Sequence, residues 1–554
     1  MPNLKRMGKQ SKRSNREQIH RIAQERFGYE FLRSGQEAAI KALLEGHDTL
    51  AVMPTGSGKS AIYQIAGLLI PGPTVVISPL LALQRDQVDS IAQQDVGEAA
   101  VVNSTVPTAQ RRQVFEALEE EELKFLFLAP EQFNNSETLD RLQNSQPSLF
   151  VVDEAHCICE WGHDFRPDYL RLGAVIEALG HPRVLALTAT AAPTVREELI
   201  ERLGMHHPQV IVQGFDRPNI WLAVKRFEDE AQKQQALLRG VVRAKKPGIV
   251  YVATRKKAEE VAGALGDKGV KAIFYHAGMK AKEREEAQAA FMNDQAEVIV
   301  ATTAFGMGVD KPNVRFVFHH DISDSVDSYY QEMGRAGRDG EKALALLFYC
   351  PDDLNIRRFL ASSGQVDVQE VEQVAAVVQE QDEPIKRRDL REQTNLSQAK
   401  LATALNRLEE VGVVETLPTG EVIPSEQPPE VSEAAEEAVR VQERYQQYLR
   451  SRLEMMRGYA EVRDCRREYL LNYFGEKLEE PCGFCDNCKA GVVVEEDDES
   501  KLFPLSSRVV HSSWGEGVVM RYEGDKMVIL FDEVGYKTLG VDLVRQCGLL
   551  KQAQ

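Results

Sequence analysis

Short apolar runs rich in β-branched residues alternate with helical stretches from about residue 20 to residue 350, and this alternation constrains the fold most. One series of runs lies within 48–190 and a second within 248–321. Apolar strands separated by helices are typical of parallel sheets that are covered on both faces. The sequence therefore predicts two α/β domains, joined near residues 214–219.

The length of 554 residues predicts several domains rather than one core. Apolar content of 43% and charged content of 27% are typical of a soluble globular chain. No apolar run is long enough to span a bilayer, and the basic N-terminus lacks the apolar segment of a secretory signal. We therefore expect no membrane partner and a cytoplasmic location. The net charge of −18 argues only weakly against nucleic acid, since a local basic stripe is what meets phosphates.

The stretch AVMPTGSGKS (51–60) ends a predicted strand and opens a predicted helix. The strict pattern G-x-x-x-x-G-K-[ST] fails because Met53 stands at its first glycine, but the shorter form from Thr55 to Ser60 is met. Gly56 and Gly58 let backbone N–H groups approach phosphate oxygens, with Ser57 between them. Lys59 would reach the β- and γ-phosphates, and the Ser60 hydroxyl would bind Mg²⁺, so the stretch predicts an ATP site.

Two further features fit phosphoryl transfer. Asp153 and Glu154 close a predicted strand, where Asp can hold Mg²⁺ and Glu can activate water. In the second α/β domain, Arg335 and Arg338 are three residues apart, so on a helix they would share a face. Positive charge delivered from a second domain stabilises the transferred phosphate, which makes these two the predicted arginine fingers.

Taken together, the chain resembles the RecQ family of superfamily 2 DNA helicases. The resemblance covers residues 25–353 almost without a gap, and it is carried by these stretches in family order: FGYEFLRSGQEAAI, MPTGSGKS, SPLLALQRDQ, LAPE, DEAHCICEWGHDFRPDYLRLG, LALTATA, FDRPNI, YHAGM, ATTAFGMGVDKPNVRFVFHHD and SYYQEMGRAGRDG. The run WGHDFRPDY behind DEAH is the most specific of them.

The resemblance implies that the aromatic-rich loop 157–173 senses single-stranded DNA and couples it to ATP hydrolysis. Aromatic side chains can stack on bases, and the loop leaves the strand that carries the two carboxylates. Arg33 and Gln36 resemble the adenine-reading motif, and Asp310 sits in a motif that faces the nucleotide. The residues expected to contact DNA are Ser78, Trp161, His163, Phe165, Arg166, Thr254 and His276.

The C-terminal half contains a metal motif with the spacing C-x16-C-x2-C-x2-C. The ligands are Cys465, Cys482, Cys485 and Cys488. Four thiolates suit a structural, tetrahedral Zn²⁺, and the spacing matches the zinc module of the family. The same spacing also resembles iron–sulfur ligation, which stays an alternative.

The region between the second α/β domain and the cysteines departs from the family order. Residues 365–424 read as helices followed by a hairpin, which is the outline of a winged helix, and this lies before the zinc module instead of after it. Lys400 and Arg407 on its recognition helix are predicted to grip duplex DNA, with protein binding or packing as the alternative. A C-terminal stretch, 503–550, resembles the Tudor-like tail of UvrD-type helicases, with a possible protein partner.

The predicted fold class is α/β, with two RecA-like parallel-sheet motor domains followed by a winged helix, a four-cysteine zinc module on a long helix and a small SH3/Tudor-like barrel. The expected boundaries are a basic disordered tail (1–20), motor domain 1 (21–217), motor domain 2 (218–353), the winged helix (365–424), a linker (425–437), the zinc module (438–490), an acidic linker (491–502) and the barrel (503–550).

The resulting functional prediction is an ATP- and Mg²⁺-dependent DNA helicase that also contains Zn²⁺. The resemblance implies 3′-to-5′ movement on forked or partly single-stranded DNA in repair or recombination, near the nucleoid if the cell is bacterial. An RNA or RNA–DNA hybrid remodeller is the alternative. A non-catalytic DNA adaptor would need a broken motor, yet all five predicted catalytic residues are present.

Overall fold

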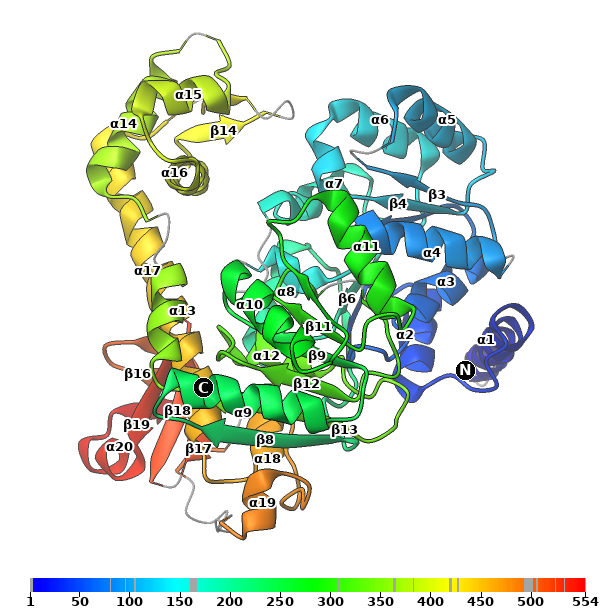
Figure 1. Cartoon of the computed structure of the whole chain (residues 1–554). Coiled ribbons are helices and arrows are strands. Elements are labelled where there is room, and N and C mark those ends of the chain that lie inside the picture. The colour runs from blue at the N-terminus through cyan, green and yellow to red at the C-terminus, as the bar shows by residue number, and fades with distance from the viewer. Residues whose placement is uncertain are drawn as a thin grey trace. The chain divides into compact units, whose positions relative to one another are not determined.

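A computed structural model describes residues 3–79, 81–94, 96–103, 106–159, 167–306, 309–361, 365–381, 383–417, 421–425, 428–492, 502–504, 507–523, 525–532 and 534–553 (Figure 1). It divides into two compact units. The first comprises Met1–Gly214 with Thr416–Glu421, and the second comprises Phe215–Glu415 and Val422–Gln554.

The first unit is built on a seven-stranded parallel sheet in the order β3-β4-β2-β5-β6-β1-β7. Its strands are β1 (Thr49–Val52), β2 (Thr74–Ile77), β3 (Ala99–Val102), β4 (Phe125–Leu128), β5 (Leu149–Val152), β6 (Arg183–Thr188) and β7 (Gln209–Val212). Its helices are α1 (Asn3–Phe27), α2 (Ser34–Leu44), α3 (Ser60–Leu69), α4 (Leu81–Gln93), α5 (Thr108–Glu119), α6 (Ser136–Ser145), α7 (Leu172–Ala178) and α8 (Pro193–Arg202), with short 3-10 helices η1 (Pro130–Asn134), η2 (Ala155–Ile158) and η3 (Pro167–Tyr169).

The inner strands of this sheet are buried, and nearly every residue in them is apolar. β1, β2, β4 and β5 are buried along their whole length. Such strands cannot face water on either side, which requires helices on both faces. The parallel sheet predicted from the alternating runs is therefore confirmed.

The basic tail was predicted to be disordered, and this is wrong for the residues from Asn3 onward. They form helix α1, which runs to Phe27. Ile19 and Ala23 lie four residues apart on one face of it and are buried in the core of the first unit. That apolar face stabilises the helix against the loss of chain entropy.

The second unit begins with a six-stranded parallel sheet in the order β10-β11-β9-β12-β13-β8. Its strands are β8 (Ile220–Arg226), β9 (Gly248–Tyr251), β10 (Ala272–Tyr275), β11 (Val298–Ala301), β12 (Phe316–His319) and β13 (Ala343–Tyr349). The helices that follow these strands are α9 (Glu230–Arg243), α10 (Arg255–Gly266), α11 (Ala281–Met292), α12 (Val326–Met333) and α13 (Asp353–Ala361).

Three helices and a hairpin follow, with their own apolar core. They are α14 (Val368–Gln379), α15 (Arg387–Thr394), α16 (Gln398–Glu410), β14 (Val414–Thr416) and β15 (Val422–Pro424). Helix α17 (Val431–Glu461) packs against this group. It starts inside the segment that was predicted to be a linker to residue 437. The long helix predicted for this module ends at Glu461, and the cysteines lie beyond it, around α18 (Arg466–Tyr473) and α19 (Asp486–Ala490).

The C-terminal residues form a five-stranded antiparallel sheet in the order β19-β18-β17-β16-β20. Its elements are β16 (Arg508–His511), β17 (Gly515–Glu523), β18 (Lys526–Phe531), β19 (Gly535–Gly540), α20 (Val541–Cys547) and β20 (Leu550–Gln552). Most of the predicted acidic linker, from residue 493 to 501, lies outside the described residues.

This C-terminal sheet contacts α18, in the cysteine module, through aromatic residues. The ring of Tyr536 stacks on that of Tyr473 in α18, with centroids 5.8 Å apart. The guanidinium of Arg521 lies 3.7 Å from the ring centroid of Tyr469. The hydroxyl of Tyr473 in turn donates to the Asp327 carboxylate on α12. The sheet is therefore bound into the second unit through side-chain contacts and not only through the chain.

Candidate active site and metal centre

The loop between β1 and α3 forms a cradle at the carboxyl end of the first sheet. Gly56 and Gly58 have φ of 75° and 76°, a left-handed conformation that favours glycine. Lys59 Nζ donates to the Met53 carbonyl at 3.2 Å, which folds the lysine back over the loop. Ser57 Oγ is buried and has no hydrogen-bond partner among the described residues. A cradle with an unsatisfied buried hydroxyl fits a polyphosphate, whose oxygens accept from such groups.

The start of helix α2 contacts this cradle through Arg33 and Gln36, the predicted adenine-reading pair. Gln36 Nε2 donates to the carbonyls of Ser57 and Gly58 at 3.0 and 2.9 Å. Arg33 Nη1 donates to the Gly56 carbonyl at 3.2 Å. Gln36 is itself held by the backbone N–H of Arg33, at 2.9 Å from its Oε1. Both residues are therefore placed on the phosphate-binding loop, and their contact with a base stays a prediction.

The paired carboxylates lie at the end of β5, as predicted. Burial raises the pKa of Asp153 to about 7, and the neighbouring Glu154 adds to that, while Lys59 opposes it. A carboxyl of this kind is partly protonated near neutral pH, and a cation would displace that proton, which fits a divalent metal ligand. Glu154 adopts a φ of 47°, an uncommon conformation for a non-glycine residue that is often found at functional sites.

Two contacts connect these carboxylates to neighbouring segments. His156 Nδ1 lies 2.9 Å from Thr188 Oγ1 and 3.4 Å from Glu154 Oε2, so it joins the carboxylate pair to the end of β6. The hydroxyl of Tyr169 donates to the Asp153 carbonyl at 3.1 Å. Tyr169 was not a predicted site residue, because only the fold places it beside β5, which ends seventeen residues earlier. Trp161, His163, Phe165 and Arg166 lie outside the described residues.

The two predicted arginine fingers lie in the second unit. Helix α12 ends at Met333, so Arg335 and Arg338 occupy the turn after it, and the expectation of a shared helical face is wrong. Arg338 Nη1 donates to the Val309 carbonyl at 2.9 Å and to Asp310 Oδ1 at 2.7 Å. Arg335 is buried, and its Nε has no hydrogen-bond partner among the described residues. The role of Arg335 toward a nucleotide stays a prediction.

The remaining predicted DNA contacts follow the ends of strands. Ser78 follows β2, and its buried Oγ has no hydrogen-bond partner among the described residues. Thr254 caps α10 by accepting from the Lys257 N–H at 3.2 Å. His276 follows β10, and its Nε2 lies 3.0 Å from a Glu259 oxygen. The DNA roles of these three residues stay predictions.

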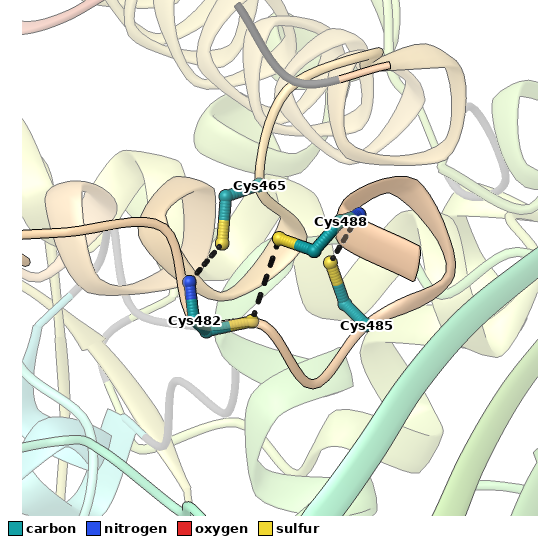
Figure 2. A group of neighbouring side chains, drawn as sticks. All are labelled: Cys465, Cys482, Cys485 and Cys488. Atoms are coloured by element: carbon teal, nitrogen blue, oxygen red, sulfur yellow. Dashed lines mark hydrogen bonds between the residues drawn. The ribbon is translucent and has the colours of Figure 1, made fainter. Parts of the chain in front are cut away.

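The four predicted metal ligands converge, as Figure 2 shows. Their sulfurs lie within 4.8 Å of one another, and those of Cys482 and Cys488 are 3.9 Å apart. Tetrahedral Zn–S bonds of about 2.3 Å place sulfurs about 3.8 Å apart, so the group fits one zinc ion. An iron–sulfur cluster spreads its thiolates over several irons and needs a wider arrangement, which disfavours that alternative.

Electrostatics and packing support the same reading of the cysteines. Burial and the neighbouring thiols raise the pKa of Cys488 to about 12, so four thiolates need a cation to stay together. The module also docks on the edge strand β8, where the Val224 N–H donates to Asp486 Oδ2 at 2.8 Å. Lys489 and Phe484 lie against the ring of Trp221. Zinc would therefore hold in place a cover for an otherwise open sheet edge.

The predicted recognition helix corresponds to α16, and both of its basic residues have acidic partners. Lys400 pairs with Glu370, and Arg407 pairs with Glu410 and lies 5.2 Å from the ring centroid of Tyr445. In the C-terminal sheet, Phe531 is buried, and Trp514 and Tyr522 pack on the same core. These aromatics serve the core, and no protein partner is shown for them.

Comparison with known proteins agrees with this geometry. Residues 33–199 match the DEAD/DEAH box helicase model, 232–340 the helicase conserved C-terminal domain, and 430–489 the RecQ zinc-binding model. The solved structure of S. cerevisiae Dbp5 bound to RNA and ADP BeF3 has a TM-score of 0.50 at 19% identity and covers 61% of this chain and 89% of that one. At that identity it supports the fold alone.

Two curated relatives are closer in sequence. The probable ATP-dependent DNA helicase RecS of Bacillus subtilis is 35% identical over 492 residues, which are 87% of this chain and 94% of that protein. The ATP-dependent DNA helicase RecQ of Pasteurella multocida is 37% identical over 465 residues, 83% of this chain. The alignment spans 61% of that RecQ. None of the described helices has the length and apolar character needed to cross a bilayer. The cradle, the carboxylate pair, the four-cysteine centre and these relatives together show that the chain belongs to the RecQ family of ATP-dependent DNA helicases.

Proposed function

We propose that the chain moves 3′ to 5′ along single-stranded DNA and separates forked or partly single-stranded DNA during repair or recombination. Membership of a family of ATP-dependent DNA helicases supports this proposal, while the polarity and the substrate rest on the resemblance of the motifs. The proposed location is the cytoplasm, at the nucleoid of a bacterial cell.

ATP with Mg²⁺ would supply a phosphoanhydride bond whose hydrolysis drives the cycle. Lys59 and Ser60 would hold the phosphates and the metal at the amino end of α3. Asp153 would hold the metal, and Glu154 would orient and deprotonate the attacking water. Arg335 would stabilise negative charge on the transferred group through its unsatisfied N–H, with Arg338 positioned by Asp310.

The hydrogen bond from the Tyr169 hydroxyl to the Asp153 carbonyl carries the proposal of DNA coupling. It ties the end of the aromatic-rich loop to the backbone of the metal-binding carboxylate. Tyr169 is fully buried and therefore cannot shift without disturbing its neighbours. Stacking of bases on Trp161 and Phe165, worth ~1–3 kcal/mol per base, could then change the position of Asp153 through Tyr169.

ATP turnover with Mg²⁺, measured with and without single-stranded DNA, tests this coupling. Trp161→Ala and Tyr169→Phe should lower the stimulation by DNA while retaining basal turnover, and Lys59→Ala should abolish both. Tyr522→Phe is a matched control, because it also removes a hydroxyl that donates to a backbone carbonyl, that of Phe503 at 2.9 Å. Full stimulation in both loop variants would refute the coupling and leave the motor intact.

The same assay with RNA tests the alternative substrate. We expect single-stranded DNA to stimulate turnover much more strongly than RNA of the same length and sequence. Equal stimulation by RNA would favour the RNA or hybrid remodeller.

We further propose that α16 contacts duplex DNA through Lys400 and Arg407, and that the C-terminal sheet binds a protein. Lys400→Glu should weaken duplex binding, and unchanged binding would refute the first of these roles.

A further inference from the structure

A second group of metal-ligating side chains lies in the first unit, away from the cysteines. It consists of Glu177, His181 and His206, whose ligand atoms lie within 4.8 Å of one another. Glu177 is on α7, His181 precedes β6 and His206 precedes β7. The group therefore sits near the amino ends of β6 and β7, the two strands that flank β1, whereas Lys59 and Asp153 follow carboxyl ends. It takes no part in the nucleotide site.

His181 lies between two carboxylates, and this arrangement demands a positive charge. Its Nε2 is 2.9 Å from Asp48 Oδ2, and its Nδ1 is 3.0 Å from Glu177 Oε1. A neutral imidazole carries one N–H only, so one of these contacts would place a lone pair against a carboxylate oxygen. A proton or a metal ion has to lie at one of the two nitrogens.

Asp48 determines which nitrogen carries the proton. Its side chain is almost completely buried and also accepts from the backbone N–H groups of Val184 at 2.9 Å and His206 at 2.7 Å. It is therefore fixed, and it keeps the His181 proton on Nε2. A buried carboxylate behind a histidine is the usual support of a metal-binding imidazole, because it sets the tautomer and the ring orientation. The Nδ1 lone pair then points at the Glu177 oxygen.

The third ligand distinguishes a metal from a proton. His206 Nε2 lies 3.9 Å from the same Glu177 oxygen, and its ring stacks on that of His181 with centroids 3.7 Å apart. A proton between His181 and Glu177 leaves the His206 ring with the stacking contact and a carboxylate oxygen beyond hydrogen-bond distance, whereas a metal ion would bind its nitrogen. Metal bonds of about 2.1 Å in a tetrahedron place ligand atoms about 3.4 Å apart. Glu177 and His206 are mostly exposed, so the His206 ring can turn out of the stack to point its nitrogen at an ion, and both ligands can close that difference.

We propose that Glu177, His181 and His206 bind a divalent transition-metal ion, of the Zn²⁺ or Co²⁺ class, supported by Asp48. Two imidazoles and one carboxylate are a donor set for such ions, whereas Mg²⁺ and Ca²⁺ favour oxygen ligands. The three ligands come from α7 and from the loops before β6 and β7. A bound ion would therefore link these three segments at the base of the first sheet.

Titration of Co²⁺ into the full-length, zinc-loaded protein tests the site. We expect one further equivalent to bind with the absorption of a nitrogen and oxygen site, without the thiolate charge-transfer band that Co²⁺ in the four-cysteine centre would give. His206→Asn should weaken this binding by about 10–100-fold or more, and Glu177→Gln should do the same. Both side chains are exposed, so the variants should fold.

His207→Asn is the matched control. His207 is the adjacent exposed histidine, outside the ligand group, and its φ of 46° is one that asparagine tolerates. This variant should bind the additional ion as the parent does. No additional equivalent in the parent, or equal binding by the His206 and His207 variants, would overturn the proposal and leave the group as a protonated ion pair.

Discussion

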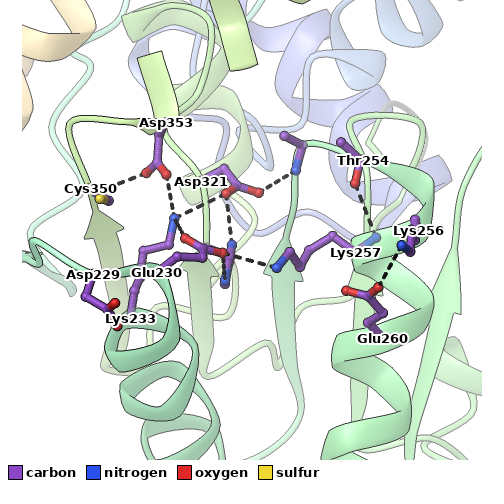
Figure 3. Close-up of polar contacts among 12 residues, drawn as sticks. Asp229, Glu230, Lys233, Thr254, Lys256, Lys257, Glu260, Asp321, Cys350 and Asp353 are labelled. Atoms are coloured by element: carbon purple, nitrogen blue, oxygen red, sulfur yellow. Dashed lines mark hydrogen bonds and ion pairs between the residues drawn. The ribbon is translucent and has the colours of Figure 1, made fainter. Parts of the chain in front are cut away.

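Lys233 lies at the centre of a buried charge cluster, and replacing it by methionine should destabilise the second motor domain strongly (Figure 3). Its side chain is 0% exposed, and Nζ lies 2.5 Å from Asp353 and 3.3 Å from Asp321. Burial opposes its charge, but the two carboxylates raise the pKa of Lys233. Lys233→Met would leave both carboxylates buried without that cation, which costs about 3–5 kcal/mol.

The cost should depend on pH in a defined direction. Burial raises the pKa of Asp353 to about 6, although Lys233 lowers it. Without Lys233 this pKa rises further, so the folded variant binds a proton that the unfolded chain releases. Stability then falls as pH rises from about 6 to the new pKa, by about 1.4 kcal/mol per pH unit. The parent shows no such slope from Asp353 above pH 6.

Urea unfolding followed by the fluorescence of Trp221, in a Trp161→Phe/Trp514→Phe background, reports on this domain. Lys257→Met is the control: Lys257 joins the same cluster through Glu230, at 3.1 Å, but is 22% exposed. Partly exposed pairs contribute ~0–1 kcal/mol, so this control should lose little stability and show no pH slope. Equal losses in the two lysine variants would refute the reasoning that burial sets the cost.

Two further results are expected of the nucleotide site. Because burial raises the pKa of Asp153 to about 7, protons should compete with Mg²⁺ for this carboxylate. The Mg²⁺ concentration for half-maximal ATP turnover should rise up to tenfold per pH unit below 7. Equal half-maximal Mg²⁺ concentrations at pH 6 and pH 8 would contradict this. Arg335→Lys should lower kcat by about 10³-fold or more with unchanged binding of ATP, as measured by nucleotide fluorescence, and a change in binding alone would assign Arg335 to the ground state.

Much of the motor was predictable because its signals are local. Apolar runs of four to six residues defined the buried strands of both sheets, and the strands place Lys59 and Asp153 at carboxyl ends. The four-cysteine centre was predictable for the same reason, since the spacing of cysteines along the chain indicates a metal site. Helix α1 was missed because its lysines and arginines hide a short apolar face that includes Ile19 and Ala23.

Contacts between distant segments could not be predicted in this way. Tyr169 reaches Asp153 because a 3-10 helix turns back beside β5. Asp48, His181 and His206 meet only because β1 lies between β6 and β7, and nothing in their spacing along the chain records that strand order. Arg335 was expected on a helix, and this is wrong because α12 ends at Met333, directly before Gly334.

The contact of Tyr536 with Tyr473 connects the C-terminal sheet to the helix that precedes the turn with Arg335. Tyr473 and Arg452 share the Asp327 carboxylate on α12, the latter at 3.1 Å, and α12 leads directly into the turn with Arg335. A chain shortened after residue 490 would keep every nucleotide-binding residue yet expose the aromatic side of α18 to water. We therefore expect that removal of the tail would loosen the turn that carries Arg335 and lower the rate of ATP hydrolysis, although the tail contributes no nucleotide-binding residue.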